Sequence, residues 1–191
     1  MHLEHIDLLD EQIARLSQEI AERLRPFEPE LSLLDTIPGV GPLTAEVWAA
    51  EIGFDLSHWP SAGHLASWSG ICPGNNESAG KRKGGKTRKG DKWLRRALVE
   101  AARGASRTDG CYLQAQFRRI KYRRGDKKAA VAVGHSILVI GYQLLTRKEP
   151  YHDLGPAYLD ERRRERAKRR ALAQLDALGF DATITRKPIA A

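Results

Sequence analysis

Residues 127–147 read KKAAVAVGHSILVIGYQLLTR, and this stretch decides the fold. As a helix it is apolar on most of its sides, which is more than the single stripe of a surface helix. It therefore predicts a helix buried at the centre of a helical domain. We interpret His135, which lies within the stretch, as a core histidine. The apolar positions are Val131, Val133, Ile137, Leu138, Val139, Ile140, Leu144 and Leu145.

Two amphipathic helices precede the central one in the sequence. The first runs to Ser106 with Asp91 as its N-terminal cap, because an aspartate there accepts hydrogen bonds from the first amides;. The second begins at Asp109, ends at Gly125 and turns its cations outward. A highly charged helix over residues 157–178 follows. We therefore predict an all-α fold: a helical domain with a helix-hairpin-helix-like motif, a basic glycine-rich loop and an N-terminal coiled-coil arm.

The arm occupies residues 1–26, with one helix over 2–25. Its apolar residues recur every three or four positions between charged flanks, which is typical of a coiled-coil seam. We expect a homo-oligomer formed through this arm. The alternative is a helix packed on its own chain. The stripe consists of Ile6, Leu9, Ile13, Leu16 and Ile20.

Residues 31–53 read as two short helices around the turn IPGVGP at 37–42. This pattern resembles the helix-hairpin-helix module of DNA repair and recombination proteins. Gly39 and Gly41 allow a close backbone approach, and amides at the start of the second helix favour a phosphate. The turn therefore predicts contacts with the DNA backbone that do not read sequence. The alternative is a plain helical hairpin with a glycine cap.

The basic glycine-rich loop spans residues 73–96. From 81 to 96 it holds nine Lys/Arg and one acid, so its net charge, 9 − 1 = +8, equals that of the whole chain. Cations neutralise phosphates and release counterions, so the loop predicts a nucleic-acid footprint. The alternative is a solvated linker. The predicted binding residues are Lys81, Arg82, Lys83, Lys86, Arg88, Lys89, Lys92, Arg95 and Arg96.

Composition argues against several other classes of protein. No run approaches 18 apolar residues, so we expect no membrane-spanning helix and no membrane partner;. Cys72 and Cys111 lack zinc spacing and are expected to be free thiols in a reducing cytosol, without a metal site in this chain;. We expect a cytoplasmic, nucleoid-associated protein.

Several motifs together carry a family resemblance over nearly the whole chain. They are the turn IPGVGP, LASWSGICP at 65–73, ESAGK at 77–81, KGDKWLRRALVEAA at 89–102 and ALGF at 177–180. The chain resembles the C-terminal part of transposases of the insertion-sequence one-ten family. Residues 30–155 would be the transposase C-terminal domain, and 156–191 a charged helix and tail.

The resemblance implies a mechanism. Full-length members of that family have a RuvC-like domain with four acidic, magnesium-binding residues, then a coiled coil, then this domain. They are DNA recombinases guided by a structured RNA. Ser78 matches the serine of the family's S-x-G motif, which is held to attack the DNA phosphate. Judged on the residues alone, Ser78 is more typical of an ordinary turn.

This sequence contains no match to the acidic quartet, so the resemblance places magnesium in the RuvC-like domain and no cofactor in this chain. We expect the chain by itself to bind DNA without cleaving it. A fragment, a decayed gene and an excised domain would all fit that departure from the family pattern. Two other functions fit the sequence: a non-catalytic DNA- or RNA-binding module, and a helical adaptor that oligomerises through its arm.

Overall fold

The structure is a computed structural model that describes residues 2–72 and 76–183. Its helices are α1 (His2–Leu24), α2 (Glu28–Asp35), α3 (Pro42–Glu51), α4 (Ala62–Trp68), α5 (Lys92–Ala105), α6 (Tyr112–Arg124), α7 (Asp126–Arg147) and α8 (Tyr158–Ala177). Short 3-10 turns lie at Arg25–Phe27 and Leu56–His58. The helical prediction is therefore confirmed for the body of the molecule. One part differs, because β1 (Asn76–Ser78) and β2 (Lys81–Gly84) form a two-stranded β hairpin inside the predicted loop.

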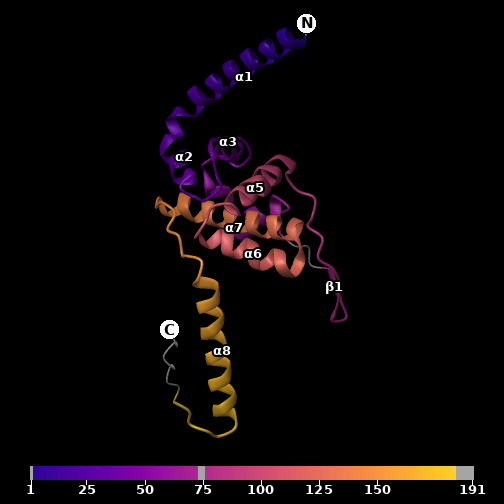
Figure 1. Ribbon diagram of the computed structural model, residues 1–191, viewed down its shortest axis with the longest axis vertical. Coiled ribbons are helices and arrows are strands. Elements are labelled where there is room, and N and C mark those ends of the chain that lie inside the picture. The colour runs from indigo at the N-terminus through magenta and orange to yellow at the C-terminus, as the bar shows by residue number, and fades with distance from the viewer. Residues whose placement is uncertain (1, 73–75, 184–191) are drawn as a thin grey trace.

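Helix α7 is the centre of the core, as its sequence predicts (Figure 1). It packs against α5 and α6, with Val133, Ile137 and Leu138 fully buried. Against expectation, α7 reaches the length and hydropathy of a membrane span. Here that apolar surface is used inside the protein: a Cβ at Gly134 would lie 3.0 Å from the carbonyl oxygen of Leu98, so α7 and α5 touch closely.

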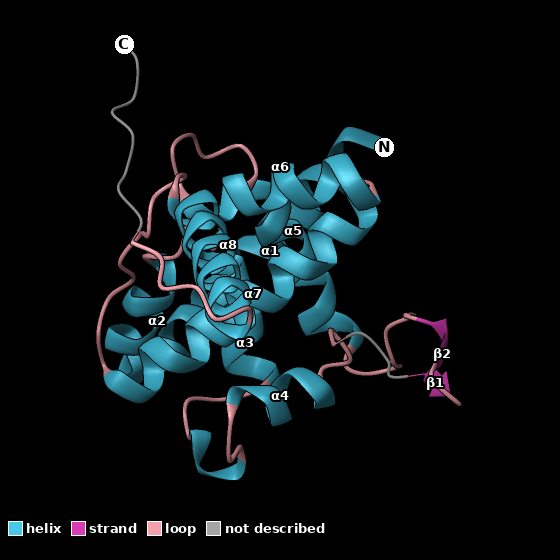
Figure 2. Ribbon diagram, turned by 90° about the horizontal axis from the view of Figure 1, so that it is seen from below, coloured by secondary structure: helices cyan, strands magenta, loops and turns pink. Residues whose placement is uncertain are grey.

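The three core helices bring distant parts of the sequence to one end of the body. Only Gly125, with φ +84°, separates α6 from α7, and Gln116 on α6 donates to Ser136 on α7 at 2.9 Å, so these helices are antiparallel. In Figure 1, the end of α5 that follows the β hairpin lies on the same side of the body as the start of α7. The first turns of α5 and α7 and the last turn of α6 therefore lie on one side of the body, which we call the cationic end. The β hairpin projects from the same side of the body (Figures 1 and 2).

Helices α1 and α8 leave the body in opposite directions (Figure 1). Every described residue of α1 up to Arg23 is exposed, including the apolar stripe, and the Ile13 side chain is 60% exposed. The stripe is thus not packed on its own chain. Helix α8 attaches to the body through Arg119 of α6, which donates to the carbonyl of Leu159 at 3.3 Å.

Two helix starts were predicted from aspartates, and the structure confirms one of them. The Asp91 carboxylate accepts the amide of Leu94 at 2.6 Å, as predicted. Helix α6, however, begins at Tyr112 rather than Asp109. The sulfur of Cys111 caps it by accepting the amide of Gln114 at 3.3 Å, while Asp109 binds the Gln114 side chain at 2.8 Å. The aspartate therefore supports the helix from outside its first turn.

Candidate nucleic-acid interface

A close crossing of two backbone segments anchors the basic segment. A Cβ at Gly90 would lie 2.4 Å from the nitrogen of Gly70, and one at Gly70 would lie 2.7 Å from the nitrogen of Gly90. No side chain fits at either position without displacing backbone. The segment that follows α4 and the segment that precedes α5 therefore contact each other at Gly70 and Gly90. The β hairpin lies between these two glycines in the sequence, so the segment that carries it starts and ends at this contact.

The β hairpin turns at Ala79 and Gly80. These residues have φ of +51° and +73°, and two positive φ values are the pattern of the type I′ turn that matches strand twist;. The strands are antiparallel, with Ser78 opposite Lys81 and Glu77 opposite Arg82. The prediction of an irregular loop was therefore wrong over 76–84, because the Ala79–Gly80 turn allows the flanking residues to pair. The residues from Gly85 to Asp91 remain largely irregular.

Ser78 is the last residue of β1 and is exposed near the tip of the hairpin. Side chains alternate along a strand, so Glu77 points to the opposite face and does not serve Ser78 as a base. The residue across the ladder on the same face is Lys81;. Within the described residues, no hydrogen bond to the Ser78 hydroxyl is formed. The geometry offers an accessible hydroxyl beside a cation, without its own general base.

Cys72, the cysteine nearest to Ser78 in the sequence, is less suited than a reactive cysteine to act as a nucleophile. Burial raises the pKa of the Cys72 thiol, and the nearby Arg88 charge only partly opposes that rise. The group therefore stays protonated near neutral pH, whereas the reactive form of cysteine is the thiolate.

Most predicted basic residues are free to meet a ligand. Lys81, Lys86, Arg88, Lys89, Lys92 and Arg96 are exposed, and Arg95 is half-buried. The side chains of Arg82 and Lys83, also predicted, lie outside the described residues. In the described part of the chain, none of these cations is paired with a carboxylate.

The α6–α7 corner adds cations that the sequence did not assign to the site. Lys121 pairs with Asp126 at 3.1 Å, but Arg123, Arg124, Lys127 and Lys128 are exposed and unpaired in the described structure. The outward-facing cations of α6 were evident in the sequence. Their location at the end that carries the basic hairpin depends on helix direction. The run KYRRGDKK at 121–128 was the available signal.

The predicted phosphate-binding turn lies elsewhere. Gly39 has φ +85°, and a Cβ there would lie 2.2 Å from the carbonyl oxygen of Ala101 on α5. Helix α3 packs against α5, and at its end burial and the neighbouring Asp91 carboxylate raise the pKa of Glu51. The turn at the other end of α3 therefore faces the later part of α5. Ten residues separate Asp91 from Ala101, or roughly 15 Å along the helix.

Gly41 and the start of α3 offer limited anion-binding capacity. Gly41 is the N-cap of α3, and a Cβ there meets nothing within 4 Å. Pro42 lacks an amide hydrogen, while the amides of Thr44 and Ala45 donate to the Gly41 carbonyl at 2.9 and 3.1 Å. The structure thus does not bring Gly39 and Gly41 together with the basic residues, and their contact with DNA stays a prediction.

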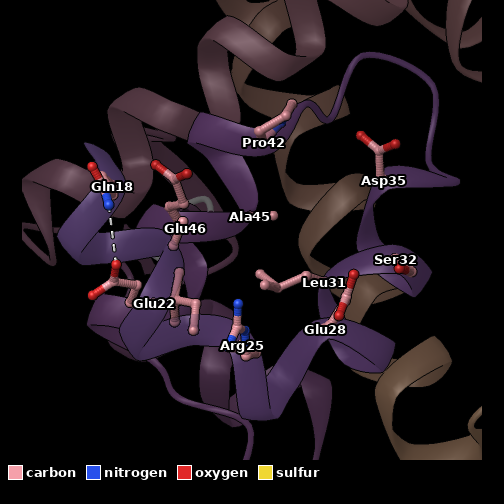
Figure 3. Close-up of a pocket in the computed structure, with 12 residues that line it drawn as sticks. Gln18, Glu22, Arg25, Glu28, Leu31, Ser32, Asp35, Pro42, Ala45 and Glu46 are labelled. Atoms are coloured by element: carbon pink, nitrogen blue, oxygen red, sulfur yellow. Dashed lines mark hydrogen bonds between the residues drawn. The ribbon is translucent and has the colours of Figure 1, made fainter. Parts of the chain in front are cut away.

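An acidic groove borders this helix hairpin (Figure 3). It lies between α1, α2 and α3 and has a volume of about 600 Å³. Leu31 and Ala45 form part of its apolar wall. Its charged lining residues are Glu22, Glu28, Asp35, Glu46 and Arg25. Four carboxylates against one guanidinium repel phosphate, so this groove is unsuited to a DNA backbone. Among the described residues, no three His, Cys, Asp or Glu side chains form a possible metal site.

Comparison with known proteins identifies the chain. Residues 31–118 match the family described as "Transposase IS116/IS110/IS902 family". The chain belongs to this transposase family. The match runs from α2 into α6 and includes the helix hairpin, the Gly70–Gly90 crossing and Ser78.

Curated transposases resemble this transposase chain beyond that segment. It is 28% identical to a probable family 20 transposase of Pseudomonas aeruginosa, over 78% of this chain and 44% of that protein. It is 31% identical to the transposase for insertion sequence element IS1111A of Coxiella burnetii, over 74% of this chain and 40% of that protein. The transposase for IS1328 of Yersinia enterocolitica is 36% identical over 52% of this chain and 30% of its own length. The chain thus spans less than half the length of these relatives.

Proposed function

We propose that this chain is the DNA-binding, serine-bearing part of a transposase. In this proposal the β hairpin and the cationic end bind DNA phosphates, and Ser78 is the nucleophile for strand cleavage and exchange. The observation that carries the proposal is the position of Ser78. It is exposed near the tip of a hairpin that projects from the body, next to unpaired cations. A protruding hydroxyl can reach a duplex without the body moving.

The proposed step is a transesterification. The Ser78 oxygen attacks phosphorus and forms a serine–phosphate ester, the bond to one sugar oxygen breaks, and that oxygen takes up a proton. Lys81, opposite Ser78 in the ladder, and the more distant Lys86 and Arg88 would offset charge developing on the non-bridging oxygens;. The serine proton needs an acceptor, because a serine hydroxyl is a weak nucleophile at its own pKa. We propose that a magnesium-binding RuvC-like domain supplies it.

Two partners complete the proposal. A structured guide RNA is the second nucleic acid, which we propose from the family resemblance. A second copy of the chain binds through α1, whose exposed apolar stripe is otherwise left in water. A cytoplasmic location follows from a DNA substrate.

A non-catalytic nucleic-acid-binding module is the second candidate. One observation favours it: within the described residues Ser78 has no general base. Both candidates require nucleic-acid binding at the cationic end, and only the first includes the covalent step.

The experiment that separates them looks for a covalent serine–DNA species. The chain is incubated with end-labelled transposon-end DNA, magnesium and a RuvC-like domain of a related transposase, and products are resolved on a denaturing gel. We expect a slow band that Ser78→Ala removes while duplex affinity changes less than about twofold, because one neutral hydroxyl contributes little beside many charges. Ser67→Ala, at an exposed serine of α4, is the matched control and should keep the band. A band that persists in Ser78→Ala would place the nucleophile elsewhere.

A further inference from the structure

Two aromatic side chains are exposed at the cationic end. Tyr122, in the last turn of α6, is 94% exposed, and Trp93, in the first turn of α5, is 54% exposed. Rings of this size would stabilise the fold more if they were buried, since burying an aromatic side chain is favourable by roughly 2–3 kcal/mol. Neither ring is used in the core.

Other exposed aromatic residues in the body have a structural partner. Trp68 packs against Trp59 with ring centroids 5.0 Å apart, and Phe27 packs against Phe54 at 5.1 Å. In the described part of the chain, Tyr122 and Trp93 form no ring pair. Their neighbours are cations instead. Lys92 Nζ lies 4.8 Å from the centre of the Trp93 ring, and Tyr122 stands between Lys121 and Arg123 in the sequence.

Aromatic rings set among cations are suited to unpaired nucleotides. Bases inside a duplex are covered by their neighbours, so a protein ring can stack only on a base that has left the helix. Surfaces that bind single strands combine such rings with cations along the backbone path. A duplex-binding surface needs the cations alone.

We propose that the cationic end binds single-stranded DNA, with bases stacked on Tyr122 and Trp93. Phosphates of the same strand contact Arg123, Arg124, Lys127 and Lys128. The proposal rests on the proposed function, which makes DNA the substrate. It adds that this end holds a strand whose bases are unpaired, such as one opened beside the hairpin during cleavage.

The test compares single-stranded and duplex binding by the full chain. Fluorescence anisotropy is measured with labelled oligo(dT) of about 15 nucleotides, near the upper site size of single-strand binders, and with a blunt duplex of the same length. Tyr122→Ala and Trp93→Ala should each weaken oligo(dT) binding roughly 5- to 150-fold, the range expected for losing one stacked base. Duplex affinity should change less than about twofold. Tyr122→Phe should retain single-strand binding, because it keeps the ring.

The control is Phe180→Ala, which removes an exposed ring (63%) beyond the end of α8, far from the cationic end, and should change neither affinity. Equal losses for single strand and duplex, or no loss in the two alanine variants, would overturn this inference. Tighter binding to oligo(rU) than to oligo(dT) would overturn it in favour of RNA. Failure of the wild-type chain to bind the duplex would instead overturn the proposed function, so the two failures are distinguishable.

Discussion

The helix hairpin and the β hairpin look alike in the sequence and differ in the structure. Both are glycine-containing turns, and both were predicted to contact phosphates. In the β hairpin, Gly80 lies at an open tip, and a Cβ there would meet nothing within 4 Å. In the helix hairpin, the backbone of α5 closes off Gly39, and the adjacent groove carries four carboxylates.

The difference shows what a glycine signal can and cannot mean. Glycine permits close approach of something to the backbone, but it does not specify whether that is a helix or a phosphate. The surrounding charge decides. Helix α1, which borders the acidic groove, carries six carboxylates and two arginines. We therefore expect the α1 side to contact protein and the cationic end to contact nucleic acid.

The largest expected effect tests the protein-facing side. Replacing Ile13 and Leu16 with Asp should dissociate the oligomer, because four charges would enter a two-stranded seam and each isolated buried charge costs several kcal/mol. Both side chains are exposed in the single chain, so thermal unfolding of the monomer should change little. Light scattering measures the mass, and Asp7→Asn with Asp10→Asn is a control outside the stripe. A wild-type chain that stays monomeric at high protein concentration would contradict the expectation that the α1 side contacts protein.

The next effect tests the closed glycine. Gly39→Ala should lower the free energy of unfolding by about 3–4 kcal/mol, since it adds a backbone clash to a positive φ;. Gly41→Ala is the matched control at the same turn. Its φ is −122° and its Cβ enters open space, so about 0.5 kcal/mol or less is expected;. Urea denaturation measures both. Equal losses would mean that Gly39 is not packed on α5.

Sequence reasoning found what local chemistry determines. The apolar pattern predicted α7, the capping chemistry of aspartate predicted Asp91 at the start of α5, and the charge run predicted the cations after Ser78. It did not predict the Gly39–α5 contact or the Gly70–Gly90 crossing, because both join residues distant in sequence. It also missed Arg123 and Arg124 as part of the same end, because that depends on how helices α5 and α6 are placed in the body.

A third prediction tests the cationic end. Changing Lys86, Arg88 and Lys89 to Glu should weaken duplex binding roughly 100-fold at low salt. The slope of log K against log salt should fall by about 2.7, since each neutralised phosphate contributes ~0.9. The control is a variant of the acidic groove in which Glu22 and Glu46 are replaced with Gln. Its affinity for the duplex should change less than about twofold. If the groove variant changed the slope as much as the triple variant, DNA would lie on the helix hairpin instead.

The smallest effect concerns the turn beside Ser78. Ala79 holds φ +51°, a conformation that disfavours alanine and that asparagine tolerates better;. Asparagine before glycine is also the preferred type I′ pair, so Ala79→Asn should stabilise the β hairpin by about 0.5–1 kcal/mol. Because the hairpin projects from the body, global unfolding should not change. Hydrogen exchange at the Ser78 and Lys81 amides should slow roughly 2- to 5-fold, while exchange in α7 stays constant.

Unchanged exchange at the hairpin would mean that the backbone of Ala79 is not strained. If the turn must bend for Ser78 to reach a DNA phosphate, the stiffer Ala79→Asn variant should also cleave DNA more slowly. Alanine at position 79 would then serve catalysis, whereas Gly39 serves packing against α5.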